Sequence, residues 1–375
     1  MTFLVAQTGD VHLDSGDPAS NERVLAFIAD ECVARGVDVF VHCGDAFASG
    51  RPPQSAWRAF YRQMAKLARA GIPVVLVEGN HERLAVPAGS RTATSVLGEA
   101  LAGLPGAWVR FVDREAALVR TPTGVQVAAV PWMAGVLPPR PGLSPSEQDR
   151  EAAAQIAGEI GRLAGQADAG MPLVLASHLS VSGARSGSER ELAVSSFAEP
   201  VVEASAIAEC GIQFAGLSHI HARGFRPPVW LAGSPNRLTF ADADQVKSFN
   251  VARFDGPVLA GVDRVATPAR PMSSVDLSDA GARRRLGGLE PGCQVRLVLQ
   301  PGETDAPDWA VRAVADAGAV LGPLKKRPPE ADVPDGVSLP EQIRPAEALE
   351  AWMARAQIPE ASRPGLREKA AALVP

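Results

Sequence analysis

Five short stretches of this 375-residue chain carry side chains that could bind metal ions or transfer protons. They are Asp10-Val11-His12, Gly44-Asp45, Gly79-Asn80-His81-Glu82, Ser177-His178 and Ser218-His219-Ile220-His221. Histidine is scarce, since the chain has only 6, and all but His42 fall within these stretches. Carboxylate, amide and imidazole donors without thiolates suit Mn, Fe, Zn or similar divalent ions. The residue types therefore indicate a candidate metal site.

Each stretch alone has an ordinary explanation. Asp-x-His after a strand is as typical of a turn as of a ligand pair, Gly-Asp is common turn chemistry, and a lone histidine such as His178 is more often structural. The pair His219 and His221 is more specific, because alternate residues of an extended segment share one face. Five such stretches in a histidine-poor chain make coincidence a poor explanation. His42 is interpreted as a strand residue packed near the site.

The elements that must position these side chains can be read from the apolar runs. Runs of strand length cover residues 3–8, 37–43, 73–77, 125–130, 172–177 and 212–217. Helical patterns lie between them, at about 20–33, 55–70 and 144–164. This alternation predicts a layered α/β domain. The polar stretches follow strands, and ligands of open α/β sheets bind just outside the carboxyl ends of strands.

The pattern changes after the last of these strands. Residues 229–232, 248–254 and 258–265 follow one another as antiparallel strands do. Beyond the prolines at 268–271, a strand at 295–300, a helix near 305–317, a Pro-rich stretch at 325–340 and two short helices predict a small α+β unit. We therefore expect a main domain over residues 1–268 and a smaller one over 269–375.

Composition limits the possible functions. With 46% hydrophobic and 21% charged residues, the chain can bury a large core, and its net charge of −5 gives no overall field that attracts nucleic acid or an anionic membrane. The first residues contain neither a basic leader nor a long apolar run, so we expect a cytoplasmic protein. The four cysteines are scattered and indicate neither disulfides nor a zinc-thiolate site.

In their order and residue types, the five stretches resemble the calcineurin-like metallophosphoesterases. The resemblance implies a four-layered sandwich of two mixed β-sheets flanked by helices, and hydrolysis of phosphoesters by water that two divalent ions activate. It also implies one metal held by Asp10, His12 and His221, a second held by Asn80, His178 and His219, and Asp45 bridging both. His81 would then protonate the leaving oxygen.

Within this superfamily the chain is most similar to the SbcD family, the nuclease subunits of a bacterial double-strand-break repair complex. The similarity lies in Arg51-Pro52-Pro53, the segment from His178 to Arg190, and Gly233 to Phe240 leading to Lys247. It implies a Mn²⁺-dependent DNA exonuclease and endonuclease acting in DNA repair and recombination, with a C-terminal capping domain that binds its partner. It also implies a homodimer formed through the phosphoesterase domain and an SbcC-like coiled-coil ATPase partner.

Three positions depart from the family pattern. Ser218 stands where many relatives have glycine, which affects only local packing. Ala48 stands where bacterial relatives often carry a second carboxylate, so the orientation of His81 must come from another group. Glu82 replaces the commoner aspartate.

The substrate is less clear from the residues. Arginines near the stretches could form a phosphate-facing rim, and the candidates are Arg51, Arg83, Arg185 and Arg237, with Arg190 and Arg223 nearby. Each alone is more often a solvated side chain. A small-molecule phosphodiesterase or phosphatase acting on a nucleotide or cyclic nucleotide stays open as an alternative. A catalytically idle scaffold is a third, although the retained His81 argues against it.

Overall fold

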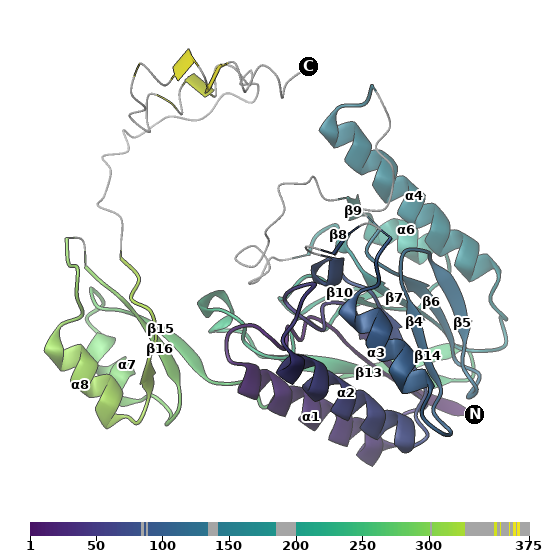
Figure 1. Cartoon of the computed structure of the whole chain (residues 1–375), viewed down its shortest axis with the longest axis horizontal. Helices are drawn as coiled ribbons and strands as arrows, with labels where there is room; N and C mark the ends of the chain where they lie inside the picture. Colours follow the sequence, from purple (N-terminus) through teal and green to yellow (C-terminus); the bar gives the residue numbers. More distant parts are fainter. Residues whose placement is uncertain are drawn as a thin grey trace. The chain divides into compact units, whose positions relative to one another are not determined.

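The computed structural model describes residues 1–326 except 84–85, 88, 134–141, 185–199 and 301. Beyond residue 326 it describes only 349–350, 353, 360, 363–364 and 366–367. In this part of the chain, the strands form two six-stranded mixed sheets, a three-stranded sheet and a two-stranded one (Figure 1). This is the mixed α/β architecture expected from the alternation of apolar runs.

The first large sheet has the strand order β14-β13-β1-β2-β3-β4. Its parallel strands are β1 (Thr2–Thr8), β2 (Val39–Cys43), β3 (Val74–Val77) and β4 (Val109–Val112). The hairpin of β13 (Ser248–Asp255) and β14 (Val258–Ala266) adds to β1 in antiparallel fashion. Because β1, β2 and β3 are parallel, their carboxyl ends meet at one edge, which carries three of the polar stretches.

The second large sheet has the order β11-β12-β10-β7-β6-β5. The parallel strands at its centre are β6 (Gln126–Val130), β7 (Leu173–His178), β10 (Phe214–Ser218) and β12 (Val229–Leu231). The edge strands β5 (Ala117–Arg120) and β11 (Gly224–Arg226) are antiparallel to their neighbours. The short pair β8 (Ser180–Val181) and β9 (Val201–Val202) is parallel.

Helices cover the outer faces of both sheets. The first sheet is covered by α1 (Pro18–Arg35), α2 (Gln54–Arg69) and α3 (Ala93–Ala102), and the second by α4 (Pro145–Gly165) and α6 (Ala204–Glu209). Helix α1 begins where the Asp17 side chain accepts a hydrogen bond from the Ser20 amide at 3.1 Å. It ends at Gly36, whose φ of 61° lies in the left-handed region that favours glycine.

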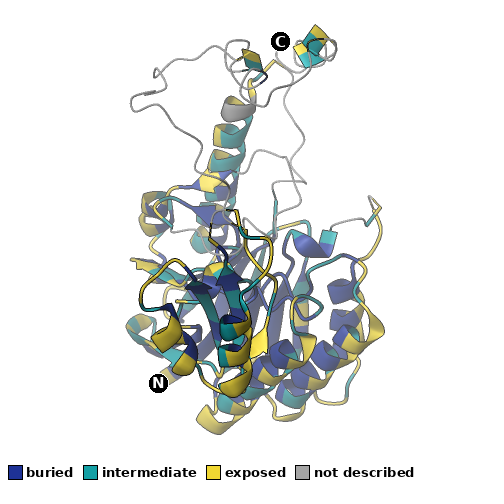
Figure 2. Ribbon diagram, turned by 90° about the vertical axis from the view of Figure 1, so that its left-hand side faces the viewer, coloured by how far each residue is buried: buried dark blue, intermediate teal, exposed yellow. Residues whose placement is uncertain are grey.

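Three apolar layers hold these elements together. One lies between the two sheets and is built largely of valines, such as Val41, Val75 and Val127. The others lie between each sheet and its helices. Figure 2 shows the buried residues gathered in the strands and on the inner faces of the helices. The four-layered sandwich expected from the family resemblance is confirmed.

One expected pairing is wrong. We expected residues 229–232 to join the later strands in an antiparallel meander, but β12 pairs parallel with β10 in the second sheet, whereas β13 and β14 complete the first. The reason is burial, because Val229 and Leu231 pack into the apolar layer beneath α4 and α6. The strands β4, β5 and β11 and the helices α3 and α6 were not predicted from the sequence.

The C-terminal sheet has a small core of its own. It consists of β15 (Met272–Asp276), β16 (Gln294–Val298) and β17 (Val320–Leu321), with α7 (Ala282–Gly287) and α8 (Asp308–Asp316). Val275, Val295 and Leu297 are fully buried in that core. Residues 1–326 form one compact unit, and a domain boundary at 268 remains a prediction. The expected C-terminal helices lie outside the described residues, apart from isolated positions.

None of the described helices is both long enough and apolar enough to cross a membrane.

Candidate metal centre

The backbone at the strand ends adopts unusual conformations. Of the five non-glycine residues with positive φ among the described residues, four come from the polar stretches, namely Asp10, His12, Asp45 and His219. Hydrogen bonds from the Asp10 amide to the Gly44 carbonyl (3.0 Å) and from the His12 amide to the Asp45 carbonyl (3.1 Å) join the loops after β1 and β2. Such conformations are costly, and they gather at functional sites where the surrounding structure holds them.

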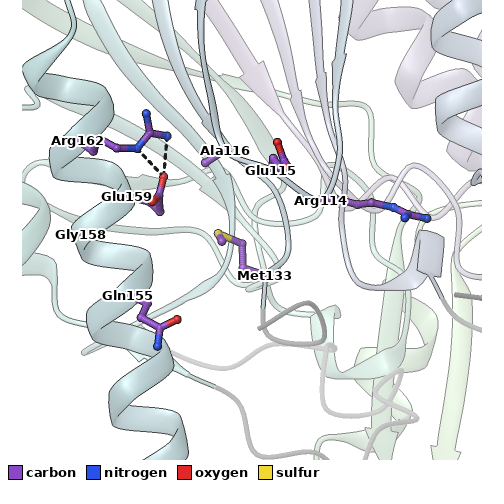
Figure 3. Close-up of a pocket in the computed structure, with 8 residues that line it drawn as sticks. All are labelled: Arg114, Glu115, Ala116, Met133, Gln155, Gly158, Glu159 and Arg162. Atoms are coloured by element: carbon purple, nitrogen blue, oxygen red, sulfur yellow. Dashed lines mark hydrogen bonds and ion pairs between the residues drawn. The ribbon is translucent and has the colours of Figure 1, made fainter. Parts of the chain in front are cut away.

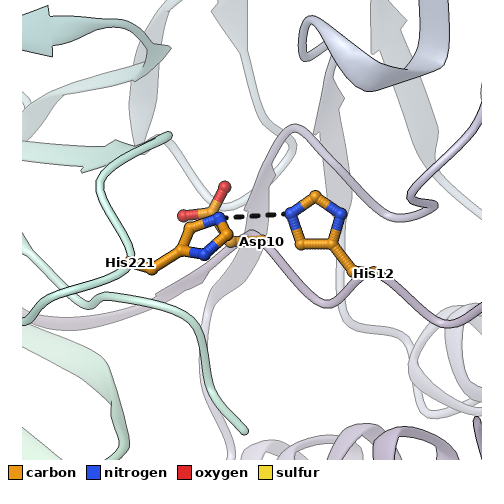
Figure 4. A group of neighbouring side chains, drawn as sticks. All are labelled: Asp10, His12 and His221. Atoms are coloured by element: carbon orange, nitrogen blue, oxygen red, sulfur yellow. Dashed lines mark hydrogen bonds between the residues drawn. The ribbon is translucent and has the colours of Figure 1, made fainter. Parts of the chain in front are cut away.

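The first ligand cluster combines Asp10, His12 and His221 (Figure 4). The two imidazole Nε2 atoms face each other at 3.2 Å. Nitrogens this close together could both bind one metal ion. Burial lowers the pKa of His12 to about 3 and holds that of His221 well below its usual value, so both rings are neutral. Neutral imidazole is the form that binds a metal.

The second cluster is centred on His178. Its Nε2 lies 2.8 Å from Asn80 Oδ1, 3.2 Å from His219 Nδ1 and 3.4 Å from Asp45 Oδ2. Its Nδ1 lies 2.8 Å from the Cys43 carbonyl oxygen, which can only accept, so Nδ1 carries the proton. A ligand histidine usually donates its second nitrogen in this way, which leaves Nε2 for the ion.

Asp45 lies between the two clusters. Its Oδ2 is 3.6 Å from Nε2 of His12 in the first and 3.4 Å from Nε2 of His178 in the second. Burial opposes ionisation of this carboxyl, but the neighbouring histidines His178, His81 and His12 outweigh it and hold the pKa well below the usual range. The structure thus places an ionised carboxylate at the position that the family resemblance assigns to a bridging ligand.

The carboxylates around His178 make this site favour positive charge. Burial disfavours the imidazolium, yet the carboxylates of Asp45 and Asp10 raise the pKa of His178 to about 10. A divalent ion would replace that proton and satisfy the same carboxylates. Three overlapping sets of buried donors have ligand atoms within 4.8 Å of one another and are consistent with two metal ions: Asp10 with His12 and His221, His12 with Asp45 and His81, and Asp10 with Asp45 and His178. Asn80 and His219 of the second cluster are half-buried. Oxygen and imidazole donors fit such ions, and they do not specify which metal binds.

His81 lies beside the clusters. Its Nδ1 is 2.9 Å from the Ala48 carbonyl oxygen, and its Nε2 is 3.9 Å from Asp45 Oδ2. The main-chain carbonyl of Ala48 therefore orients the His81 ring, because the alanine side chain has no group that could do so. The ring also meets His12 edge to face, with centroids 4.8 Å apart. The ligand atoms of His12, Asp45 and His81 are close enough to hold an ion, so geometry alone permits His81 a second role.

Glu82 organises the loops beneath the site. Its buried carboxylate accepts hydrogen bonds from the amides of Ala46 (2.6 Å), Gly79 (2.9 Å) and Asp45 (3.0 Å). Burial and the nearby Asp45 raise the pKa of Glu82 to about 8. The longer glutamate thus joins the loop that carries Asn80 to the loop that carries Asp45. His42 is buried against Phe60, with ring centroids 5.4 Å apart, and belongs to none of the ligand clusters among the described residues.

The four predicted substrate-binding arginines have different surroundings. Arg51 is exposed. Arg83 forms an ion pair with the buried Glu78. The guanidinium of Arg237 donates to the main-chain carbonyls of Arg270 and Gln245, both at 2.9 Å, which gives it a structural role. Arg185, like Arg190, lies outside the described residues. Of the described arginines, Arg83 and Arg237 are held by other groups of the protein, and a role of the four in substrate binding remains a prediction.

Sequence reasoning missed Trp132. Its ring lies 4.9 Å from that of His219, tilted by 37°, and meets His178 edge to face at 6.0 Å. Trp132 follows β6, so it too stands at the carboxyl end of a central strand. That position was the available signal, because an aromatic residue there faces the same edge as the ligands.

A cavity of about 540 Å³ is lined by residues outside the ligand clusters. Met133 and Gln155 help to line it, between α4 and the turn that joins β4 to β5 (Figure 3). Its charged residues include Arg162 and Glu159, which pair with each other at 2.7 Å. It contains none of the metal-ligand candidates and mixes both signs of charge, so the chemistry lies at the buried clusters.

Two mixed sheets whose adjoining strand ends carry carboxylate and imidazole clusters define a metal-dependent phosphoesterase. Residues 3–135 of the 375-residue chain match the calcineurin-like phosphoesterase family, which is also the family that the five polar stretches resemble.

The chain is also similar to curated proteins over a longer stretch. It is 23% identical over 288 residues to SbcD of the SbcCD nuclease from Escherichia coli K12, covering 72% of this chain and 70% of that protein. The same values hold for the SbcD protein from Escherichia coli O157:H7.

Solved structures are similar at lower levels. A dimetal phosphatase from Danio rerio aligns with 13% identity and a TM-score of 0.43, covering 71% of this chain and 96% of that one. The protein TT1561 of Thermus thermophilus aligns with 11% identity and a TM-score of 0.36, covering 67% of this chain and 94% of that one.

Proposed function

We propose that this metallophosphoesterase is a DNA nuclease of the SbcD type, with exonuclease and endonuclease activity in DNA repair and recombination. The observation that carries the proposal is the length of the similarity to SbcD of the SbcCD nuclease. At 288 residues it runs well beyond the region that matches the phosphoesterase family, residues 3–135. A match of the metal-binding motifs alone would not extend so far.

The proposed roles follow the geometry of the clusters. Asp10, His12 and His221 would hold one ion, Asn80, His178 and His219 the other, and Asp45 both. We propose Mn²⁺ as the native metal, because the resemblance to the SbcD family implies it and the donor set admits it among other divalent ions. Two bound divalent ions supply positive charge that activates water and offsets the charge of a phosphodiester.

His81 is the proposed proton donor to the leaving oxygen. Because its Nδ1 is held by the Ala48 carbonyl, its Nε2 is the atom that can carry a transferable proton. The His81 side chain is 7% exposed, whereas those of His12 and Asp45 are 0% and 1% exposed, so His81 is the least buried of the three. A positioned acid of this kind contributes a factor on the order of 10²–10⁴ in rate.

The charge around the site favours a second candidate, a phosphodiesterase acting on a small substrate. Non-specific affinity for DNA comes from cationic contacts to phosphates. Here the net charge is −5, Arg83 is paired with Glu78, and Arg237 is engaged by main-chain carbonyls. If the chain is a nuclease, the positively charged side chains that bind DNA phosphates would have to come from a partner protein or a second copy of the chain. We propose an SbcC-like coiled-coil ATPase partner and a homodimer formed through the phosphoesterase domain, in the cytoplasm.

A cleavage assay separates the two candidates. The purified chain with Mn²⁺ would be given linear DNA, hairpin DNA and a small chromogenic phosphodiester, with and without the ATPase from the same organism. Asp45→Asn is the control for contaminating nucleases, because it removes the carboxylate shared by both clusters. Mn²⁺-dependent DNA cleavage that Asp45→Asn abolishes supports the nuclease. Turnover of the small diester with intact DNA, even with the ATPase present, would overturn it in favour of the second candidate.

A further inference from the structure

His12 and His221, the two histidines of the first cluster, come from different sheets. His12 follows β1 of the first sheet and His221 follows β10 of the second. The main-chain carbonyl of each is held by a buried side chain. Asn21 Nδ2, from α1, donates to the His12 carbonyl at 2.9 Å, and Lys247 Nζ, from the residue before β13, donates to the His221 carbonyl at 3.0 Å.

These two side chains belong to one continuous network. Asn236 Nδ2 donates to Asn21 Oδ1 at 2.8 Å. The Asn236 carbonyl accepts from the Ser234 hydroxyl at 2.9 Å, and that hydroxyl accepts from Lys247 Nζ at 2.8 Å. Every side chain in this path is at most 3% exposed. The path therefore runs from one histidine to the other through the protein interior.

The direction of each hydrogen bond is fixed by groups that can act in only one way. Asn236 Oδ1 accepts from the main-chain amides of Arg237 (2.9 Å) and Arg270 (3.0 Å), so its Nδ2 must be the donor toward Asn21. Asn21 Nδ2 donates to two carbonyls, those of His12 and Ser15, both at 2.9 Å. The network consequently has one arrangement of donors and acceptors, and flipping either amide would break it.

Lys247 would oppose a nearby divalent ion if its charge stood alone. Its ammonium group forms an ion pair with Asp242 Oδ1 at 3.1 Å, and both side chains are buried. Asp242 neutralises the ammonium, so Lys247 keeps its hydrogen bonds without adding net positive charge near the cluster. The close packing here also requires Gly233, where a Cβ atom would lie 2.6 Å from the His221 carbonyl oxygen.

We propose that Asn21, Asn236 and Lys247 are positioning residues that fix the separation of His12 and His221 so that the pair is preorganised for a metal ion. This inference rests on the proposed dinuclear site. A satisfied buried network is rigid because its bonds strengthen one another and have no alternative partners. It holds the two Nε2 atoms 3.2 Å apart, so that both could bind one metal ion.

The test measures metal binding separately from stability. Asn21→Ala removes the hydrogen-bond donor to the His12 carbonyl. Asn236→Ala interrupts the network, although both histidine carbonyls keep their donors. The double variant Lys247→Met with Asp242→Asn removes the donor to the His221 carbonyl without leaving a buried charge. Gln126→Ala is the matched control. Gln126 is 2% exposed and bonds the backbone of Asp168 in both directions, but it lies at the end of β6 away from the site.

Mn²⁺ titration by calorimetry and the electron paramagnetic resonance spectrum of the manganese pair are the readouts. We expect each network variant to bind one ion with unchanged affinity and the other at least tenfold more weakly, with the coupled-pair spectrum replaced by that of isolated Mn²⁺. Gln126→Ala should lose stability yet bind both ions normally. The proposal is overturned if the network variants that fold bind both ions as the wild type does. If the wild-type chain itself does not bind two ions, the proposed dinuclear site is wrong, and the proposed function is overturned together with it.

Discussion

The Nδ1 atom of His81 lies 2.9 Å from the main-chain carbonyl oxygen of Ala48. Position 48 has no carboxylate to orient the imidazole, and the backbone of the same residue takes over that task. The loop that carries Ala48 is held in turn by Asp14, whose carboxylate accepts a hydrogen bond from the Ala48 amide at 2.6 Å. A short chain of contacts thus runs from Asp14 to the proposed proton donor.

Replacing His81 separates proton donation from metal binding. We expect His81→Ala to lower kcat by a factor on the order of 10²–10⁴, since the leaving oxygen loses its acid, while two Mn²⁺ ions remain bound. The measurements are kcat on the preferred phosphodiester and metal content by elemental analysis. Loss of one ion together with activity would instead make His81 a ligand, as its closeness to His12 and Asp45 permits.

Asp14→Ala should make the orientation of the His81 ring less well fixed, although it leaves the His81 side chain itself unchanged. The loss of the hydrogen bond to the Ala48 amide frees the loop, so we expect kcat to fall several-fold with KM and metal content unchanged. Asp38→Ala is the control, because Asp38 accepts from the Leu4 amide at 2.7 Å at the other end of β1. Each variant should lose about 1 kcal/mol of stability. Equal kinetics for the two variants would argue against a role for Asp14.

Gly79→Ala should disrupt the site directly. A Cβ atom at Gly79 would overlap the Asp45 carboxylate, which lies between the two clusters. We expect the variant to fold with reduced stability and to bind fewer than two ions, as measured by thermal unfolding and metal titration. Gly158→Ala is the control, because this residue of α4 has open space around its Cα and helix interiors favour alanine by about 0.5–1 kcal/mol.

Trp132→Ala tests the aromatic contact with His219. Pairs of this kind contribute about 0.5–1.5 kcal/mol beyond the area they bury. We therefore expect up to about tenfold weaker binding of the ion held by His219, with Trp132→Phe close to the wild type. Trp108→Ala, which removes a partly buried tryptophan from the layer between the sheets, should leave metal affinity unchanged. Isothermal titration with Mn²⁺ gives both affinities.

Removing the metal should destabilise the fold. Bound ions offset the negative charge of the buried carboxylates of Asp10 and Asp45, and an ion at 100 times its dissociation constant adds about 2.7 kcal/mol of stability. We expect a chelator to lower Tm and added Mn²⁺ to restore it. Asp45→Asn should show a much smaller response. If the Tm of the wild type changes with neither chelator nor added Mn²⁺, metal binding does not stabilise the fold.

Much of the fold could be predicted from apolar patterns. The six strands at residues 3–8 to 212–217 were found because parallel strands buried on both faces are nearly continuous runs of Val, Leu and Ala. The strand at Val229 was assigned to the wrong partner, because its pattern indicates a strand but not the sheet that accepts it. The edge strands β5 and β11 were missed because they are short and only partly buried.

The sequence by itself determined the chemistry available to this protein, because residue types at strand ends limit which ions and protons can be handled. Only the tertiary structure decided how these groups meet. It places the Nε2 atoms of His12 and His221, which come from different sheets, 3.2 Å apart, and it directs the Ala48 carbonyl at Nδ1 of His81. It also pairs Arg83 with Glu78 and Arg237 with a main-chain carbonyl. Such contacts depend on the packing of segments far apart in the chain, which local patterns do not encode.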